Sequence, residues 1–125
     1  MRTVEDRRRA QRRGVLAESA VADLLSKAGW TVLFRNWRGT TGELDLVVQR
    51  DGALRIVEVK AREEGDPAES IGPNKRRRLI RAAEELLSAH TDPYDEVCFM
   101  LALLTPAQDA DGEWQVEFID NAFDA

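Results

Sequence analysis

The dipeptide Asp51-Gly52 is the feature that most constrains the fold of this chain of 125 residues. It joins two mainly apolar runs, residues 43–50 and residues 53–61. A two-residue Asp-Gly connection between such runs is a strong signal for a tight β-hairpin. With this turn Arg50 faces Ala53, and the numbers of every directly opposed pair add up to 103. The sequence therefore predicts both strands and their register.

This register brings charged side chains together, although strands disfavour Asp and Glu. Asp45 faces Glu58 and Glu43 faces Lys60, and because side chains alternate across a strand, all four lie on one face. Opposed Cβ atoms are about 4.5–5.5 Å apart, so like charges there destabilise a sheet. Folding alone would not favour Asp45 opposite Glu58. Lys60 would offset the repulsion in part, and a hard divalent cation would offset it better.

The same pattern leaves a second interpretation open. A solvent-facing antiparallel pair with a bridge between Glu58 and Lys60 would be an ordinary surface. In either case, the opposite face of the hairpin is expected to pack in the core. That face carries Leu44, Leu46, Val48, Val57 and Val59.

The rest of the chain predicts helices and further strands around the hairpin. An Arg-rich arm, residues 1–13, precedes one domain, residues 14–125. Its fold class is expected to be α/β, with a mixed sheet of about five strands flanked by helices in the order α-β-β-β-α-β-β. Apolar spacing and β-branched or aromatic runs place the remaining elements. They are helices over residues 14–28 and 74–89, strands over 30–35, 97–104 and 114–119, and loops over 36–42 and 62–73.

Both helices show an apolar stripe at 3.6-residue spacing. Glu18 lies at the edge of the first stripe, near where the helix meets the sheet. This position fits a partly buried metal ligand, and equally an edge residue that reaches solvent. The stripes consist of Ala17, Val21, Leu24, Leu25 and Ala28 in the first helix, and Leu79, Ala82, Ala83, Leu86 and Leu87 in the second.

Charge is distributed unevenly along the chain. All 18 Lys and Arg lie in residues 1–81 beside 12 acids, a net +6, whereas residues 82–125 hold 11 acids and neither Lys nor Arg. Such basic residues either solvate surface helices or attract a polyanion. No apolar run reaches the ~20 residues of a membrane span, and no secretory signal opens the chain. With a single cysteine, a cytoplasmic location without membrane contact is expected.

The hairpin resembles the PD-(D/E)xK nuclease superfamily, which includes many restriction enzymes and archaeal Holliday junction resolvases. The motif would be Asp45 followed by Glu58-Val59-Lys60, with Leu44 where the motif has Pro. A closer similarity is to the YraN family of small bacterial proteins, which are predicted endonucleases. "GELDLV", "VEVKAR" and "KRRRLIRAAEELL" carry it across residues 14–90. The following strand, "YDEVCFMLALL", is more apolar than the family pattern.

The resemblance implies a restriction-endonuclease-like fold and roles for single residues. Asp45 and Glu58 would hold Mg²⁺ or Mn²⁺, with Glu18 binding the metal directly or through water. Lys60 would orient the attacking water and stabilise developing negative charge. Glu43 would pair with Lys60, or would contact the metal ligands without binding the metal itself.

Basic residues at the start of the second helix are unusual, because cations there oppose the helix macrodipole. Their clustering suggests phosphates as partner. Trp37, in the loop over 36–42, would stack on an unpaired base or anchor packing. The candidate nucleic-acid-binding residues are Lys75, Arg76, Arg77, Arg78 and Arg81, with Arg12 and Arg13 of the arm and Arg38 of the loop.

Two functions follow from these residues. The first is a metal-dependent endonuclease that hydrolyses phosphodiester bonds of nucleic acid, with DNA, including branched or flapped DNA, as the expected substrate. The alternative is a non-catalytic nucleic-acid-binding module with a nuclease-like fold. A homodimer would suit cleavage of two strands, by analogy. A third hypothesis, an interaction protein that uses its acidic residues 82–125, has little support.

Overall fold

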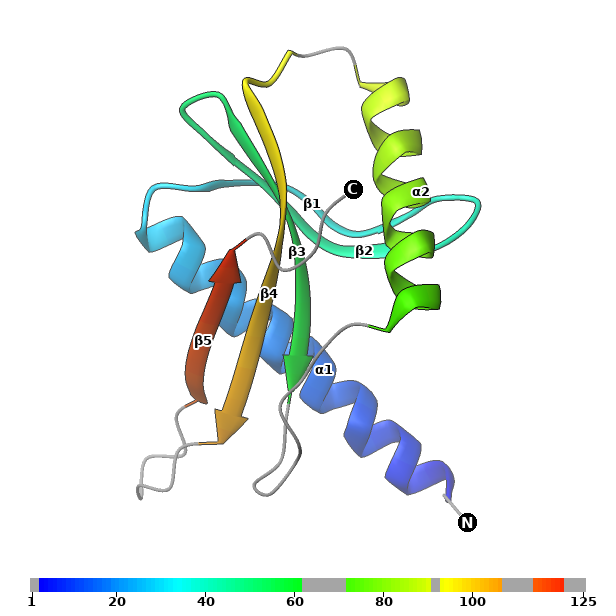
Figure 1. Ribbon diagram of the computed structural model, residues 1–125. Helices are drawn as coiled ribbons and strands as arrows, with labels where there is room; N and C mark the ends of the chain where they lie inside the picture. The colour runs from blue at the N-terminus through cyan, green and yellow to red at the C-terminus, as the bar shows by residue number, and fades with distance from the viewer. Residues whose placement is uncertain (1–2, 62–71, 91–92, 107–113, 121–125) are drawn as a thin grey trace.

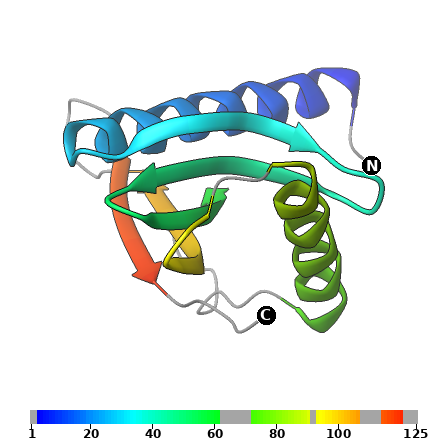
Figure 2. The same cartoon turned by 90° about the horizontal axis from the view of Figure 1, so that it is seen from above.

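A computed structural model describes residues 3–61, 72–90, 93–106 and 114–120, and of residues 5–13 the backbone alone. One β-sheet carries a helix on each face, as the view from above shows most clearly (Figure 2). The sheet lies between the helices α1 and α2 (Figure 1). In chain order the elements are α1 (Val4–Lys27), β1 (Thr31–Arg38), β2 (Glu43–Arg50), β3 (Ala53–Ala61), α2 (Pro73–Ala89), β4 (Glu96–Pro106) and β5 (Trp114–Asp120).

The sheet is mixed, and its strands follow the chain order β1-β2-β3-β4-β5. The first three strands form an antiparallel meander, β3 and β4 pair in parallel, and β5 returns antiparallel to β4. A parallel pair needs a crossover connection, and α2 supplies it. The predicted fold class and element order are confirmed, and this architecture is consistent with a restriction-endonuclease-like fold.

The hairpin turn sets the register as predicted. Leu46 pairs with Val57 and Arg50 with Ala53, so the numbers of opposed residues add up to 103. Asp51 and Gly52 both have positive φ, 49° and 81°, the conformation that a type I′ turn requires. A Cβ on Gly52 would lie 2.5 Å from Asp95 Oδ2. The positive φ favours glycine here, whereas the Asp95 carboxylate lies at the end of a flexible side chain that could shift.

Both faces of the sheet are buried, each in its own apolar cluster. The α1-side cluster includes Val21, Leu46, Val48 and Val57. The α2-side cluster includes Leu44, which was expected on the other face with Leu46 and Val48. This expectation is wrong because alternation is interrupted at Asp45, whose carboxylate reaches across to β3.

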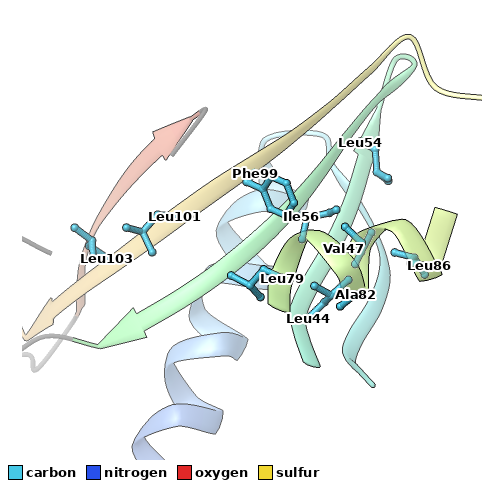
Figure 3. Close-up of a cluster of buried hydrophobic side chains, with 11 residues drawn as sticks. Leu44, Val47, Leu54, Ile56, Leu79, Ala82, Leu86, Phe99, Leu101 and Leu103 are labelled. Atoms are coloured by element: carbon cyan, nitrogen blue, oxygen red, sulfur yellow. The ribbon is translucent and has the colours of Figure 1, made fainter. Parts of the chain in front are cut away.

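The α2-side cluster is the core that fixes the second helix (Figure 3). Four of the five residues of the predicted α2 stripe are buried, Leu87 being partly so. The helix thereby covers Val47 and Ile56 of the hairpin and Phe99 of β4. In α1, Ala22 is buried, whereas Leu24 and Ala28 are exposed and were wrongly assigned to the stripe.

Two element boundaries differ from the prediction by more than two residues. The first helix begins at Val4, so the backbone of the Arg-rich arm is continuous with α1. Strand β1 extends to Arg38, so Trp37 lies in a strand rather than a loop, where it packs against the α2-side cluster. Pairing with β2 gives the backbone N–H and C=O groups of these residues hydrogen-bond partners. This pairing stabilises the strand although their composition is typical of a loop. Within the described ranges, neither helix is long and apolar enough to cross a membrane.

Candidate functional site

A cavity of about 450 Å³ lies where α1, the start of β2, the end of β3 and the first turn of α2 come together. Its lining is mainly polar and charged. Four carboxylates line it, those of Glu18, Glu43, Asp45 and Glu58. Two cations, Lys75 and Arg78, also line it, together with Thr41, Gly42 and Leu79.

The side chains of Asp45 and Glu58 are brought together just beyond the end of the β2–β3 ladder, although the ladder does not extend to a direct pairing of these two residues as predicted. Leu46–Val57 is the pair nearest the cavity in that ladder. Beyond it, the Val59 N–H donates a hydrogen bond to Asp45 Oδ2 at 2.9 Å. The Asp45 side chain thus replaces a backbone acceptor of the ladder and is fixed by it. Glu58 is buried, with 8% of its surface exposed, so the solvent-facing interpretation of the hairpin is wrong for Glu58.

Lys75, rather than Lys60, pairs with the buried glutamate. Lys75 Nζ lies 2.9 Å from Glu58 Oε1, and its charge also acts on Asp45. Lys60 is exposed near the end of β3, and the described lining residues do not include it. The spacing of Glu58 and Lys60 holds them on one strand, but the first turn of α2 brings a second cation closer to the carboxylates.

The electrostatics of the site are those of crowded, desolvated carboxyl groups. Burial, followed by the charge of Asp45, raises the pKa of Glu58 from 4.5 to about 7. Burial also raises the pKa of Asp45, while the Val59 N–H and Lys75 act in the opposite direction. The two carboxyl groups share a hydrogen bond. The repulsion inferred from the register is therefore present in the fold.

Glu18 lines the same cavity from α1 and is partly buried. Burial and then the charge of Asp45 raise its pKa, while a hydrogen bond with the Asn36 side chain lowers it. Asn36 has a positive φ of 51°, a conformation that Asn tolerates better than most residues. Among the described residues, no three Asp, Glu, His or Cys side chains gather closely enough to bind a metal directly.

Most of the remaining predicted residues are not among the described lining residues of the cavity. Glu43 pairs with Arg38, at 3.6 Å on the surface, in place of its expected partner Lys60. Arg76, Arg77 and Arg81 lie on α2 but not among the described lining residues. The side chains of Arg12 and Arg13 lie outside the described part of the chain.

A clamp between α2 and the β1–β2 loop was not predicted. Glu85 accepts hydrogen bonds from the Thr40 N–H at 2.8 Å and the Thr40 hydroxyl at 2.6 Å. A Cβ on Gly39 would lie 2.7 Å from Glu85 Oε2, so glycine allows the close approach. The clamp positions Thr41 and Gly42, which line the cavity. The bonded residues are 45 positions apart, and no local pattern marks such a contact.

Residues 17–104 match the model of the uncharacterised protein family UPF0102, the YraN family. The chain belongs to this family. The match contains Glu18, Asp45, Glu58 and Lys75, and ends at residue 104 within β4, before β5 begins. The UPF0102 core thus includes the whole cavity, and the predicted family is confirmed.

Curated UPF0102 proteins align with most of the chain. One from Gloeobacter violaceus is 41% identical over 120 residues, covering 93% of this chain and 95% of the relative. One from Synechococcus sp. is 36% identical and covers 91% of this chain and 92% of the relative. One from Rhodopseudomonas palustris is 39% identical and covers 78% of this chain and 76% of the relative.

The raised pKa of Glu58 makes stability depend on pH. The folded protein holds the proton up to about pH 7, whereas the unfolded chain releases it near 4.5. The folded state binds more protons in this window, so Glu58 makes the free energy of unfolding fall as pH rises from about 4.5 to 7. Glu58→Gln is expected to remove this contribution, on the order of 3 kcal/mol. Urea unfolding between pH 5 and 8 with EDTA measures it.

Glu84→Gln is the matched control, because Glu84 is exposed on α2 and does not line the cavity. Its stability should follow the wild-type curve at every pH. Parallel curves for wild type and Glu58→Gln would mean that the carboxyl group of Glu58 is not held protonated by the fold.

Proposed function

We propose that this protein is a metal-dependent endonuclease that hydrolyses phosphodiester bonds of nucleic acid, using Mg²⁺ or Mn²⁺. This proposal is carried by the pairing of the partly buried Asp45 with the buried Glu58, in a cavity that Lys75 and Arg78 also line. Two carboxylates forced together below the surface weaken the fold unless a cation joins them. Clusters of this kind occur preferentially at functional sites.

The donor set fits a hard divalent cation. Mg²⁺ is usually bound by one or two carboxylates and keeps several waters and substrate phosphate oxygens as further ligands. Asp45 and Glu58 would supply the direct ligands, the Val59 carbonyl a further one, and Glu18 contact through water. A metal bound here would polarise the scissile phosphate and lower the pKa of a bound water.

The protein's own groups then have separate tasks. The Val59 N–H fixes the orientation of Asp45 before any ligand binds. Lys75 and Arg78 add positive charge to the lining of the cavity, where they would attract phosphate oxygens. Lys60 lies two positions after Glu58 on β3. The resemblance implies that Lys60 would orient the attacking water. Glu43, held by Arg38, adds negative charge to the carboxylate side.

Positive residues beyond the cavity would extend the contact along a polymer. We assign phosphate binding to Arg76, Arg77 and Arg81 on α2 and to Arg12 and Arg13 in the N-terminal part of α1. Each phosphate contact would add to a salt-dependent affinity. DNA, including branched or flapped DNA, is the proposed substrate, and a homodimer would place two such cavities on one molecule of DNA.

The test is metal-dependent cleavage by the purified wild-type protein. Linear, flapped and four-way-junction DNA, each with an RNA counterpart, should be incubated with Mg²⁺, Mn²⁺ or EDTA and resolved on denaturing gels. Cleavage with either metal and none with EDTA is expected. Salt-sensitive binding without cleavage on every substrate and metal would contradict the enzyme and favour the non-catalytic binding module.

A further inference from the structure

The geometry points to Lys75 as an internal competitor for the metal: its ammonium group neutralises Glu58 and must withdraw before a divalent cation can bind there. This inference rests on the proposed metal site. It gives Lys75 a positioning role that differs from the role of the other basic residues of α2. The ammonium group would exchange one partner, Glu58, for another, a substrate phosphate.

The ion pair occupies the atoms that a metal would need. Lys75 Nζ lies 2.9 Å from Glu58 Oε1, with 11% of the Glu58 side chain and 50% of the Lys75 side chain exposed. The same ammonium charge also acts on the neighbouring Asp45. A divalent cation bound by both carboxylates would bring two positive charges to this position, so metal and Lys75 cannot share Glu58 favourably.

The placement of Lys75 explains why it pairs here. It lies in the first turn of α2, which contains no acidic residue, and the positive end of the helix dipole disfavours a cation there. Glu58 supplies the compensating negative charge from β3. Half of the Lys75 side chain is solvent-accessible. This long, flexible side chain can therefore move away from Glu58 without a movement of the helix.

The exchange would couple the binding of metal and phosphate. Once displaced, the Lys75 ammonium would stay within the cavity that Arg78 also lines, where a phosphate would attract it. A phosphate that holds Lys75 there weakens its competition for Glu58, and by linkage the metal strengthens phosphate binding by the same factor. The site would thus favour metal most when nucleic acid is present.

Manganese titration calorimetry without nucleic acid tests the competition directly. Lys75→Met keeps an unbranched side chain, one heavy atom shorter, and removes its charge. It is expected to tighten Mn²⁺ binding about fivefold, the upper range for a partly exposed ion pair. Arg77→Met is the matched control, since Arg77 is an exposed cation two residues away that does not line the cavity. Its affinity should change less than about twofold. Lys75→Arg restores the competing charge and should return the affinity toward wild type.

The outcomes separate this inference from the proposed function. Binding to Lys75→Met that is tighter than to wild type and to Arg77→Met supports the competition, as does binding to Lys75→Met alone. Equal affinities, or equal tightening in both methionine variants, would leave the metal site standing and overturn the role of Lys75. No binding by any variant would overturn the metal site and the competition together. Circular dichroism of each variant establishes that it is folded.

Discussion

Asp45→Asn is expected to lower metal-dependent cleavage about a thousandfold or more. The asparagine side chain has the same shape, and its oxygen can still accept the hydrogen bond of the Val59 N–H that Asp45 Oδ2 accepts at 2.9 Å. It lacks the negative charge that holds a divalent cation. Single-turnover cleavage with saturating Mn²⁺ measures the chemical step, and calorimetry on the same sample measures the loss of metal.

The same substitution should not weaken the fold. Asp45 raises the pKa of Glu58 by repulsion, so removing its charge at pH 8 relieves an unfavourable interaction. The free energy of unfolding should therefore stay unchanged or rise. Asp23→Asn, at an exposed position of α1, is the control and should retain full activity. Wild-type cleavage by a folded Asp45→Asn protein would contradict the proposed site.

Leu86→Ala is expected to have the largest effect on stability, a loss of about 2–5 kcal/mol in the free energy of unfolding. Leu86 is 2% exposed and belongs to the α2-side cluster with Val47 and Leu54 of the hairpin. Its truncation leaves a cavity between the helix and the sheet. The closely packed neighbouring side chains cannot move into this cavity without strain. Urea unfolding monitored by tryptophan fluorescence gives the change.

Glu84→Ala is the control for that measurement, because Glu84 lies on the exposed side of the same helix. Its effect should stay within about 0.5 kcal/mol. A loss below about 1 kcal/mol for Leu86→Ala would mean that α2 is not packed firmly on the sheet, and the position of Lys75 over Glu58 would then lose its support.

The hairpin was predictable from sequence because its determinants are local. The Asp51-Gly52 turn fixes the register up to the Leu46–Val57 pair, and Asp45 and Glu58 are the next residues beyond that pair. The apolar stripe of α2 could be predicted in the same way, since the periodicity of apolar residues indicates which face of a helix is buried. The family resemblance added a proposed function to a site that the residues had already outlined.

Contacts between distant elements were not predictable in this way. Lys75 reaches Glu58 from another element, and Glu85 reaches Thr40 across the cavity rim. Neither contact has a sequence spacing that indicates it. Leu44 was assigned to the wrong face because strict alternation assumes an undisturbed strand, and the Asp45 carboxylate disturbs this one.

The parallel pairing of β3 with β4 also has a consequence for the order in which the chain folds. The β1–β2–β3 meander needs only short turns. By contrast, β3 can pair with β4 only after a long segment has closed, since Ala53 pairs with Glu96, 43 positions later in the chain. Closing such a long loop is slow compared with forming a hairpin. During synthesis, the inner edge of β3 would stay open until β4 has left the ribosome. A transient mispairing of that edge with another nascent chain is the misfolding route to which this topology is most exposed.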